Sequence, residues 1–257
     1  MPALLVCLVS FLAAALTFVS GFGLGTILLP VFALLYPLPV AVAATAVVHL
    51  LNNLFKLLLV GRQADWRVVL RFGIPALVAA VAGAALLLRL GAAEPLATWS
   101  VAGLDGQVTP AKLVVGGVLL VVTLIEFAPR LAAAKLPTAV LPLGGLLSGF
   151  LGGLSGMQGA MRAAFLVRLD LSKQAFVATG AVVATLVDFA RLGVYGTGLP
   201  GRLGQVDARL LLAAVGAAFL GALVGNRILA SVTSAALHRL VAIMLALAAI
   251  ALMAGLV

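Results

Sequence analysis

Charged residues are scarce in this sequence. They make up only 9% of the 257 residues, whereas a soluble domain carries about a quarter. Hydrophobic residues account for 65% of the chain, and the mean hydropathy is +1.31. This composition excludes a water-soluble globular domain and predicts a protein that lies within a membrane over nearly its whole length.

Cysteine and histidine are also scarce, with one cysteine, Cys7, and two histidines. A single cysteine excludes an internal disulfide, and two scattered histidines give no cluster of metal ligands. The sequence also contains no nucleotide-binding loop and no nucleophile motif. We therefore expect neither a cofactor nor a metal.

The formal net charge is +9. In a soluble protein this excess would point to nucleic acid, but here the basic residues fall mostly one to three per connecting loop. Their expected role is to anchor loops to anionic lipid head groups, so we expect lipid contacts and no nucleic acid partner. No Lys or Arg precedes the first apolar run, which favours a retained first helix over a cleaved signal peptide.

Long apolar runs separated by short connections recur along the chain. Because the bilayer core offers no hydrogen-bond partners, and the alternation of outer-membrane strands is missing, these runs should be helices. Eight runs approach or reach the spanning length of about 20 residues; they are 3–20, 38–60, 68–90, 112–129, 137–156, 174–197, 209–231 and 235–257. The sequence predicts an all-α polytopic membrane protein with about eight transmembrane helices and a kink at Pro75.

A glycine-rich motif occurs twice. Residues 19–25 (VSGFGLG) recur in altered form at 154–159 (LSGMQG), and each copy precedes an apolar segment too short to cross, 24–36 or 159–168. We expect these segments to be re-entrant or half-helices. The downstream positions also correspond: Thr45 with Thr179, Asn53 with Asp188, and Lys56 with Arg191. The chain is therefore predicted to consist of two related four-helix repeats, 1–128 and 129–257.

Duplicated halves with glycine-interrupted helices are typical of transporters, because broken helices expose backbone amides that can hold a solute at membrane depth. The alternative is that these glycines serve close helix packing. The segment 20–30 (SGFGLGTILLP) and the stretch 149–156 followed by Ala175 and Thr179 resemble the two repeats of the TauE/SafE family of sulfite-exporter-like permeases. That resemblance implies an eight-helix permease of the bacterial inner membrane that moves small sulfur-containing anions such as sulfite or organosulfonates.

Four polar residues lie on one stripe of the 38–60 run. His49, Asn52, Asn53 and Lys56 are spaced i, i+3, i+4 and i+7. Polar side chains near a helix centre cost about 2.5–3.5 kcal/mol on insertion scales, so they should face protein or water. We expect His49 and Asn53 to line a cavity, while Lys56 either lines it or snorkels to the interface.

Asp188 and Arg191 occupy the matching helix of the second half. Asp188 lies well inside the 174–197 run, and Arg191 follows it by three positions. Two roles are open: Asp188 and Arg191 form an i, i+3 ion pair, or Asp188 acts as a proton relay. A proton is therefore a candidate coupling ion, carried by Asp188 or His49.

Arg162 lies within the second interrupted segment, four residues after Gln158 and among apolar neighbours. A planar guanidinium binds an oxyanion through two parallel hydrogen bonds, and half-helix amides add positive charge; the alternative is an interfacial anchor. We expect an anion site at the repeat interface, formed by the following residues: Arg162, Gln158, Thr26, Gly23, Gly25, Gly156 and Gly159, with His49, Asn53 and Lys56 beside it.

The sequence thus favours a permease that moves a small anion by alternating access and not an enzyme. Two alternatives stay open: an integral-membrane enzyme that uses His49 and Asp188 as base and acid, and a non-transporting membrane subunit that packs through its glycine faces.

Overall fold

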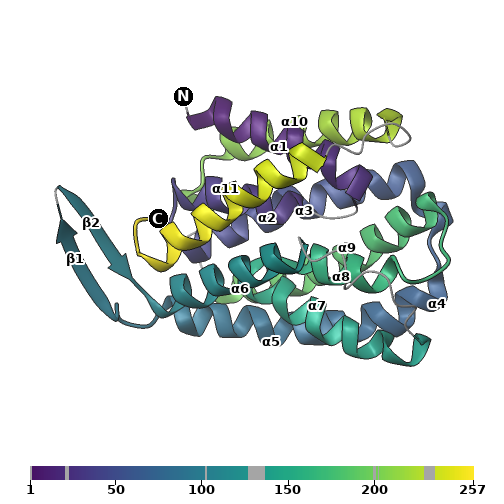
Figure 1. The fold of residues 1–257 in the computed structure, drawn as a ribbon, viewed down its shortest axis with the longest axis horizontal. Helices are drawn as coiled ribbons and strands as arrows, with labels where there is room; N and C mark the ends of the chain where they lie inside the picture. The colour runs from purple at the N-terminus through teal and green to yellow at the C-terminus, as the bar shows by residue number, and fades with distance from the viewer. Residues whose placement is uncertain are drawn as a thin grey trace.

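Helices form nearly the whole molecule. The computed structural model describes residues 2–20, 23–101, 103–126, 137–198, 201, 203–228 and 235–257. Its long helices are α1 (Pro2–Ser20), α3 (Leu38–Val60), α5 (Ile74–Gly91), α6 (Pro110–Glu126), α7 (Leu141–Ser155), α9 (Lys173–Gly198), α10 (Ala208–Ile228) and α11 (Ala235–Met253). They pack lengthwise into an elongated bundle (Figure 1). One helix therefore lies at each of the eight predicted runs.

Among the residues that the structure describes, five helical stretches are long and apolar enough to cross a membrane. These are Leu38–Gln63, Trp66–Gly91, Thr138–Ser155, Lys173–Gly198 and Ala208–Arg227. The exterior of the bundle is apolar as well: Leu4 is 76%, Leu58 84% and Leu212 69% exposed. Large exposed apolar side chains on many helices are expected of a surface that faces lipid. The molecule is a multi-pass helical membrane protein.

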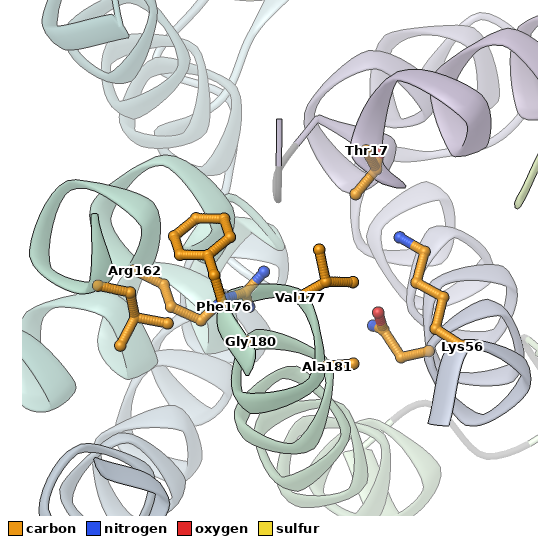
Figure 2. A pocket seen from close by; sticks show the side chains of 9 residues that line it. Thr17, Lys56, Arg162, Phe176, Val177, Gly180 and Ala181 are labelled. Atoms are coloured by element: carbon orange, nitrogen blue, oxygen red, sulfur yellow. The ribbon is translucent and has the colours of Figure 1, made fainter. Parts of the chain in front are cut away.

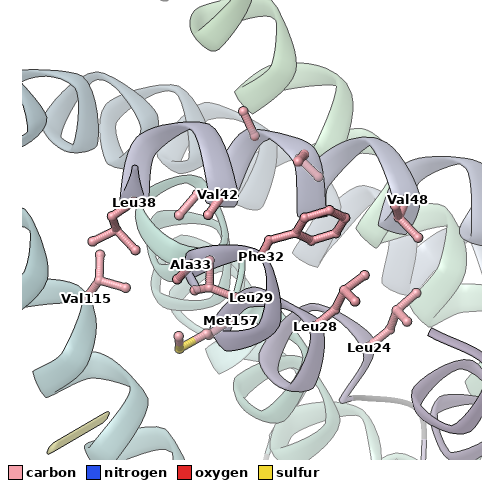
Figure 3. Packing of buried hydrophobic residues seen from close by; sticks show 14 of the residues in the cluster. Leu24, Leu28, Leu29, Phe32, Ala33, Leu38, Val42, Val48, Val115 and Met157 are labelled. Carbon is pink, nitrogen blue, oxygen red and sulfur yellow. The ribbon is translucent and has the colours of Figure 1, made fainter. Parts of the chain in front are cut away.

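Two short helices, α2 (Leu24–Ala33) and α8 (Gln158–Leu166), lie at the predicted interrupted segments. Each follows a glycine with positive φ, Gly23 (122°) or Gly156 (81°), a conformation that other residues adopt only at a cost. Helix α2 runs antiparallel beside α3, where Leu24, Leu28 and Phe32 pack into the buried core (Figure 3). The glycines therefore let the chain turn back within the bundle.

The closest packing joins helices that are far apart in the sequence. Helix α1 packs along α10, α5 along α7, and α3 along α9. Glycines make the first two contacts possible, because a Cβ on Gly221 would overlap the carbonyl of Phe11, and one on Gly149 would overlap the carbonyl of Ala76. Small residues let helix backbones approach closely, so glycine serves close packing at these two positions, which lie outside the two motif copies.

The third run is interrupted, as its proline predicts, but the interruption precedes Pro75. Helix α4 (Trp66–Val68) passes through a π-helical turn (η2, Val69–Gly73) into α5. Because Pro75 has no backbone N–H and its ring crowds the preceding turn, the hydrogen-bond register widens there. Helix α4 is capped by Asp65, whose side chain accepts hydrogen bonds from the backbone N–H groups of Arg67 and Val68.

A β-hairpin interrupts the helical pattern, which the all-α prediction missed. Strands β1 (Ala97–Val101) and β2 (Leu104–Val108) pair antiparallel and project from one end of the bundle (Figure 1). Trp99 Nε1 donates to the carbonyl of Ala254 (2.8 Å), and the backbone N–H of Gln107 donates to that of Gly255 (2.9 Å). These contacts fasten the hairpin to the C-terminus, a long-range pairing with no short-range signal.

Candidate functional site

Charged and polar side chains from three helices meet inside the bundle. His49, Asn53 and Lys56 come from α3, Gln158 and Arg162 from α8, and Asp188 and Arg191 from α9; none is more than 4% exposed. Their positions follow from local sequence, since the α3 residues share one helical stripe and Asp188 and Arg191 are one turn apart. Buried charges require partners, and the structure provides them.

Asp188 is the centre of this network. Its Oδ1 accepts hydrogen bonds from Arg191 Nε (3.0 Å) and Nη2 (2.7 Å), and from Gln158 Nε2 (3.4 Å). Its Oδ2 lies 2.6 Å from His49 Nδ1. The predicted ion pair between Asp188 and Arg191 is therefore present. The same carboxylate contacts His49, the other residue predicted as a candidate to carry the coupling proton. Asp188 joins all three helices at one point.

The hydrogen bonds also assign the tautomer of His49. A carboxylate only accepts, so neutral His49 carries its hydrogen on Nδ1 and donates it to Asp188. Asn53 Nδ2 then donates to Asp188 Oδ2 (3.3 Å), and it lies 3.0 Å from His49 Nδ1 and 3.5 Å from His49 Nε2. With Nδ1 as the donor, Nε2 is the ring nitrogen left as an acceptor.

Arg162 and Lys56 line one buried pocket. In Figure 2 they approach it from opposite sides, Lys56 from α3 and Arg162 from α8. Arg162 Nη1 donates to Gln158 Oε1 (3.3 Å), which links the pocket to Asp188. The full lining is Thr17, Asn53, Lys56, Arg162, Leu166, Phe176, Val177, Gly180 and Ala181. The pocket has room for about one water molecule, so it is nearly closed.

Glycines of the two predicted motif copies pack against each other and against this polar network. A Cβ on Gly25 would lie 2.8 Å from the carbonyl oxygen of Gly156, so the two copies of the motif meet directly. Gly156 also packs against the guanidinium of Arg191, where a Cβ would lie 2.7 Å from Nη1. Gly23 caps α2, and Thr26 and Gly159 are buried in the first turns of α2 and α8. None of these five residues is among those that line the pocket.

Several pocket residues were not anticipated from the sequence. Thr17 comes from the apolar first helix, and Phe176 and Gly180 come from the start of α9. Gly180 admits the arginine, because a Cβ there would lie 3.3 Å from Arg162 Nε. Its one sequence signal is its place next to Thr179, which matched Thr45 in the repeat; Thr17 and Phe176 have no such signal.

The charges in this region are unbalanced. Among the buried residues that the structure describes, the cations are Lys56, Arg162 and Arg191, and the single acid is Asp188. Arginine stays protonated in proteins, so the two arginines alone exceed the one carboxylate. Asp188 is shared with Arg191 and His49, whereas Arg162 reaches it through Gln158. An excess of buried positive charge beside a pocket favours an anionic occupant.

The sequence matches the family model described as sulfite exporter TauE/SafE over residues 6–252. Neither the curated proteins nor the solved structures contained a match. The family match covers nearly the whole chain, and the helical, apolar-surfaced bundle with its buried cationic pocket suits a transporter and not an enzyme. The chain therefore belongs to the TauE/SafE sulfite exporter family and is a multi-pass membrane transporter.

Proposed function

We propose that this protein carries a small sulfur oxyanion, sulfite or an organosulfonate, across the bacterial inner membrane by alternating access. One observation carries the proposal: Lys56 from the first half of the chain and Arg162 from the second line the same buried pocket. A pocket formed by cations from both halves can open to either side when the halves move relative to each other.

The pocket offers suitable donors for such an anion. The guanidinium of Arg162 can form two parallel hydrogen bonds to oxyanion oxygens, and the ammonium of Lys56 and the amide of Asn53 add further donors. The lining residues that the structure describes include no acid. Leu166, Phe176 and Val177 supply an apolar wall that strengthens electrostatic attraction by excluding water.

The helix packing supports two related repeats, 1–128 and 129–257, with eight spans in total. In that scheme α1 corresponds to α7, α2 to α8, α3 to α9, and α5 to α10. The pairs α1–α10 and α5–α7 are then equivalent contacts, and α3–α9 is the contact between equivalent helices. The pocket lies beside that central pair, which is where an alternating-access transporter binds its substrate.

The conformation described here is nearly closed, because a pocket with room for about one water cannot hold sulfite. Binding of the anion must therefore increase the distance between Arg162 and Lys56, which lies on the opposite side of the pocket (Figure 2). Phe176 and Val177 of α9 lie at the pocket, so movement of the start of α9 relative to α3 would widen it.

Arg162→Ala should slow anion exchange at least about tenfold, because a charge-assisted hydrogen bond contributes about 1.5–3 kcal/mol. The measurement is counterflow of radiolabelled sulfite in proteoliposomes, with methanesulfonate as competitor. Arg162→Lys should give an intermediate rate, since lysine keeps the charge but not the two parallel donors. Arg227→Ala, which removes an exposed arginine from the end of α10, is the matched control and should exchange at the wild-type rate.

Two results would contradict the proposal. Exchange by Arg162→Ala at the wild-type rate would show that Arg162 is an anchor and not a binding group. No exchange of sulfite or sulfonates by the wild type would contradict the proposed substrate class, and other anions would then be tested.

A further inference from the structure

The anion pocket and the His49–Asp188 pair share side chains. Asn53 lines the pocket, and its Nδ2 lies 3.3 Å from Asp188 Oδ2, 3.0 Å from His49 Nδ1 and 3.5 Å from His49 Nε2. A second connection runs from Arg162 through Gln158 to Asp188 Oδ1. A ligand that changes the position of Asn53 or Arg162 therefore changes the surroundings of the histidine.

We propose that His49 binds one proton together with the transported anion, and that this proton adds to Nε2. This inference rests on the proposed function, since it assigns the coupling ion of the same site. Nδ1 already donates to Asp188, so Nε2 is the nitrogen free to accept the proton. The proton comes from water on the side to which the site is open, and it leaves the same nitrogen on the other side. One N–H bond forms and later breaks.

The charges around His49 make anion and proton binding cooperative. The charged groups that act on His49 are Asp188 and Arg191 from α9 and Arg162 from α8. Asn53, on its own helix, contacts the imidazole, Gln158 of α8 contacts Asp188, and Lys56 lies two turns further along α3 at the pocket; from α2, the uncharged Gly25 packs beside the ring. With the pocket empty, the nearby cations disfavour a further positive charge on the imidazole. A bound anion offsets them and favours the imidazolium, which Asp188 also stabilises.

Linkage makes this effect reciprocal: if the anion strengthens proton binding, a lower pH strengthens anion binding. For a monovalent anion the bound pair adds no net charge. The pH gradient and the anion gradient would then set the direction of net transport, and the membrane potential would act mainly on the empty protein.

The test compares steady-state accumulation in proteoliposomes. Potassium on both sides with valinomycin holds the membrane potential at zero, and a pH difference of about one unit is imposed. The anion is sulfite or methanesulfonate, whichever the counterflow assay shows to be carried. If His49→Gln moves the anion without the proton, each pH unit lowers the steady-state ratio of inside to outside anion concentration about tenfold relative to the wild type. The wild type should therefore accumulate about tenfold more anion than His49→Gln.

Steady-state accumulation does not depend on rate, so slower exchange by the variant does not obscure the result. His49→Asn is a second substitution that should behave in the same way, and His238→Gln, at the only other histidine, should accumulate like the wild type. Equal accumulation by the wild type and either His49 variant would overturn the proton site. Absence of any exchange by the wild type would instead overturn the proposed function.

Discussion

Asp188→Asn is expected to destabilise the protein by about 3–5 kcal/mol, the effect of removing one partner from a buried ion pair. Asp188 is fully buried, and its Oδ1 accepts two hydrogen bonds from Arg191. Asparagine has nearly the same shape, so the change removes charge while keeping packing. The guanidinium of Arg191 would then stay buried without the carboxylate that it contacts, and α3 would lose the contact from His49.

Thermal unfolding of the purified protein in detergent measures this effect. Asp105→Asn is the matched control, because Asp105 is exposed on β2 and its replacement should change stability by less than about 0.5 kcal/mol. The double variant Asp188→Asn/Arg191→Met should recover much of the lost stability, since it removes both buried charges. If the single variant unfolds at the wild-type temperature, Asp188 serves transport alone and does not hold the three helices together.

The sequence predicted the helices well because membrane burial leaves a strong local signal. Each of the eight runs contains a helix, and the two short segments became α2 and α8. The hairpin Ala97–Val108 was missed because its stability depends on contacts with Ala254 and Gly255, which are distant in the chain. The spacing of apolar residues in a sequence indicates the buried face of a helix. It does not indicate that a hairpin packs against residues near the C-terminus.

The site was predictable only in part, for a similar reason. Rare polar residues in apolar helices identified His49, Asn53 and Arg162, because each is costly to place in lipid. The sequence could not say that His49 and Asp188, 139 positions apart, share a hydrogen bond, or that Thr17 reaches the same pocket. Threonine is common in membrane helices, where it bonds its own backbone, so its presence carries little information.

The second large effect is expected at the contact between α5 and α7. Gly145, Gly149 and Gly153 are spaced four residues apart on α7. A Cβ on Gly149 or Gly153 would overlap a backbone carbonyl of α5, and one on Gly145 would overlap the carbonyl of Phe72 in the preceding turn η2. Backbone cannot rotate away as a flexible side chain can, so any added atom must separate the helices. Gly149→Ala is expected to cost about 1–3 kcal/mol through overpacking, and Gly149→Leu more.

Gly216→Leu is the control for Gly149→Leu, because Gly216 lies on the exposed side of α10 with nothing within 4 Å of an added Cβ. Both changes improve helix propensity by up to about 1 kcal/mol, so only the contact differs between them. Gly149→Leu should lower the unfolding temperature in detergent, whereas Gly216→Leu should leave it unchanged or raise it. Equal stability of the two variants would show that α5 and α7 are not in backbone contact. If the contact holds, α5 and α7 form a rigid pair, and opening of the pocket must then occur where α3 meets α9, at His49 and Asp188.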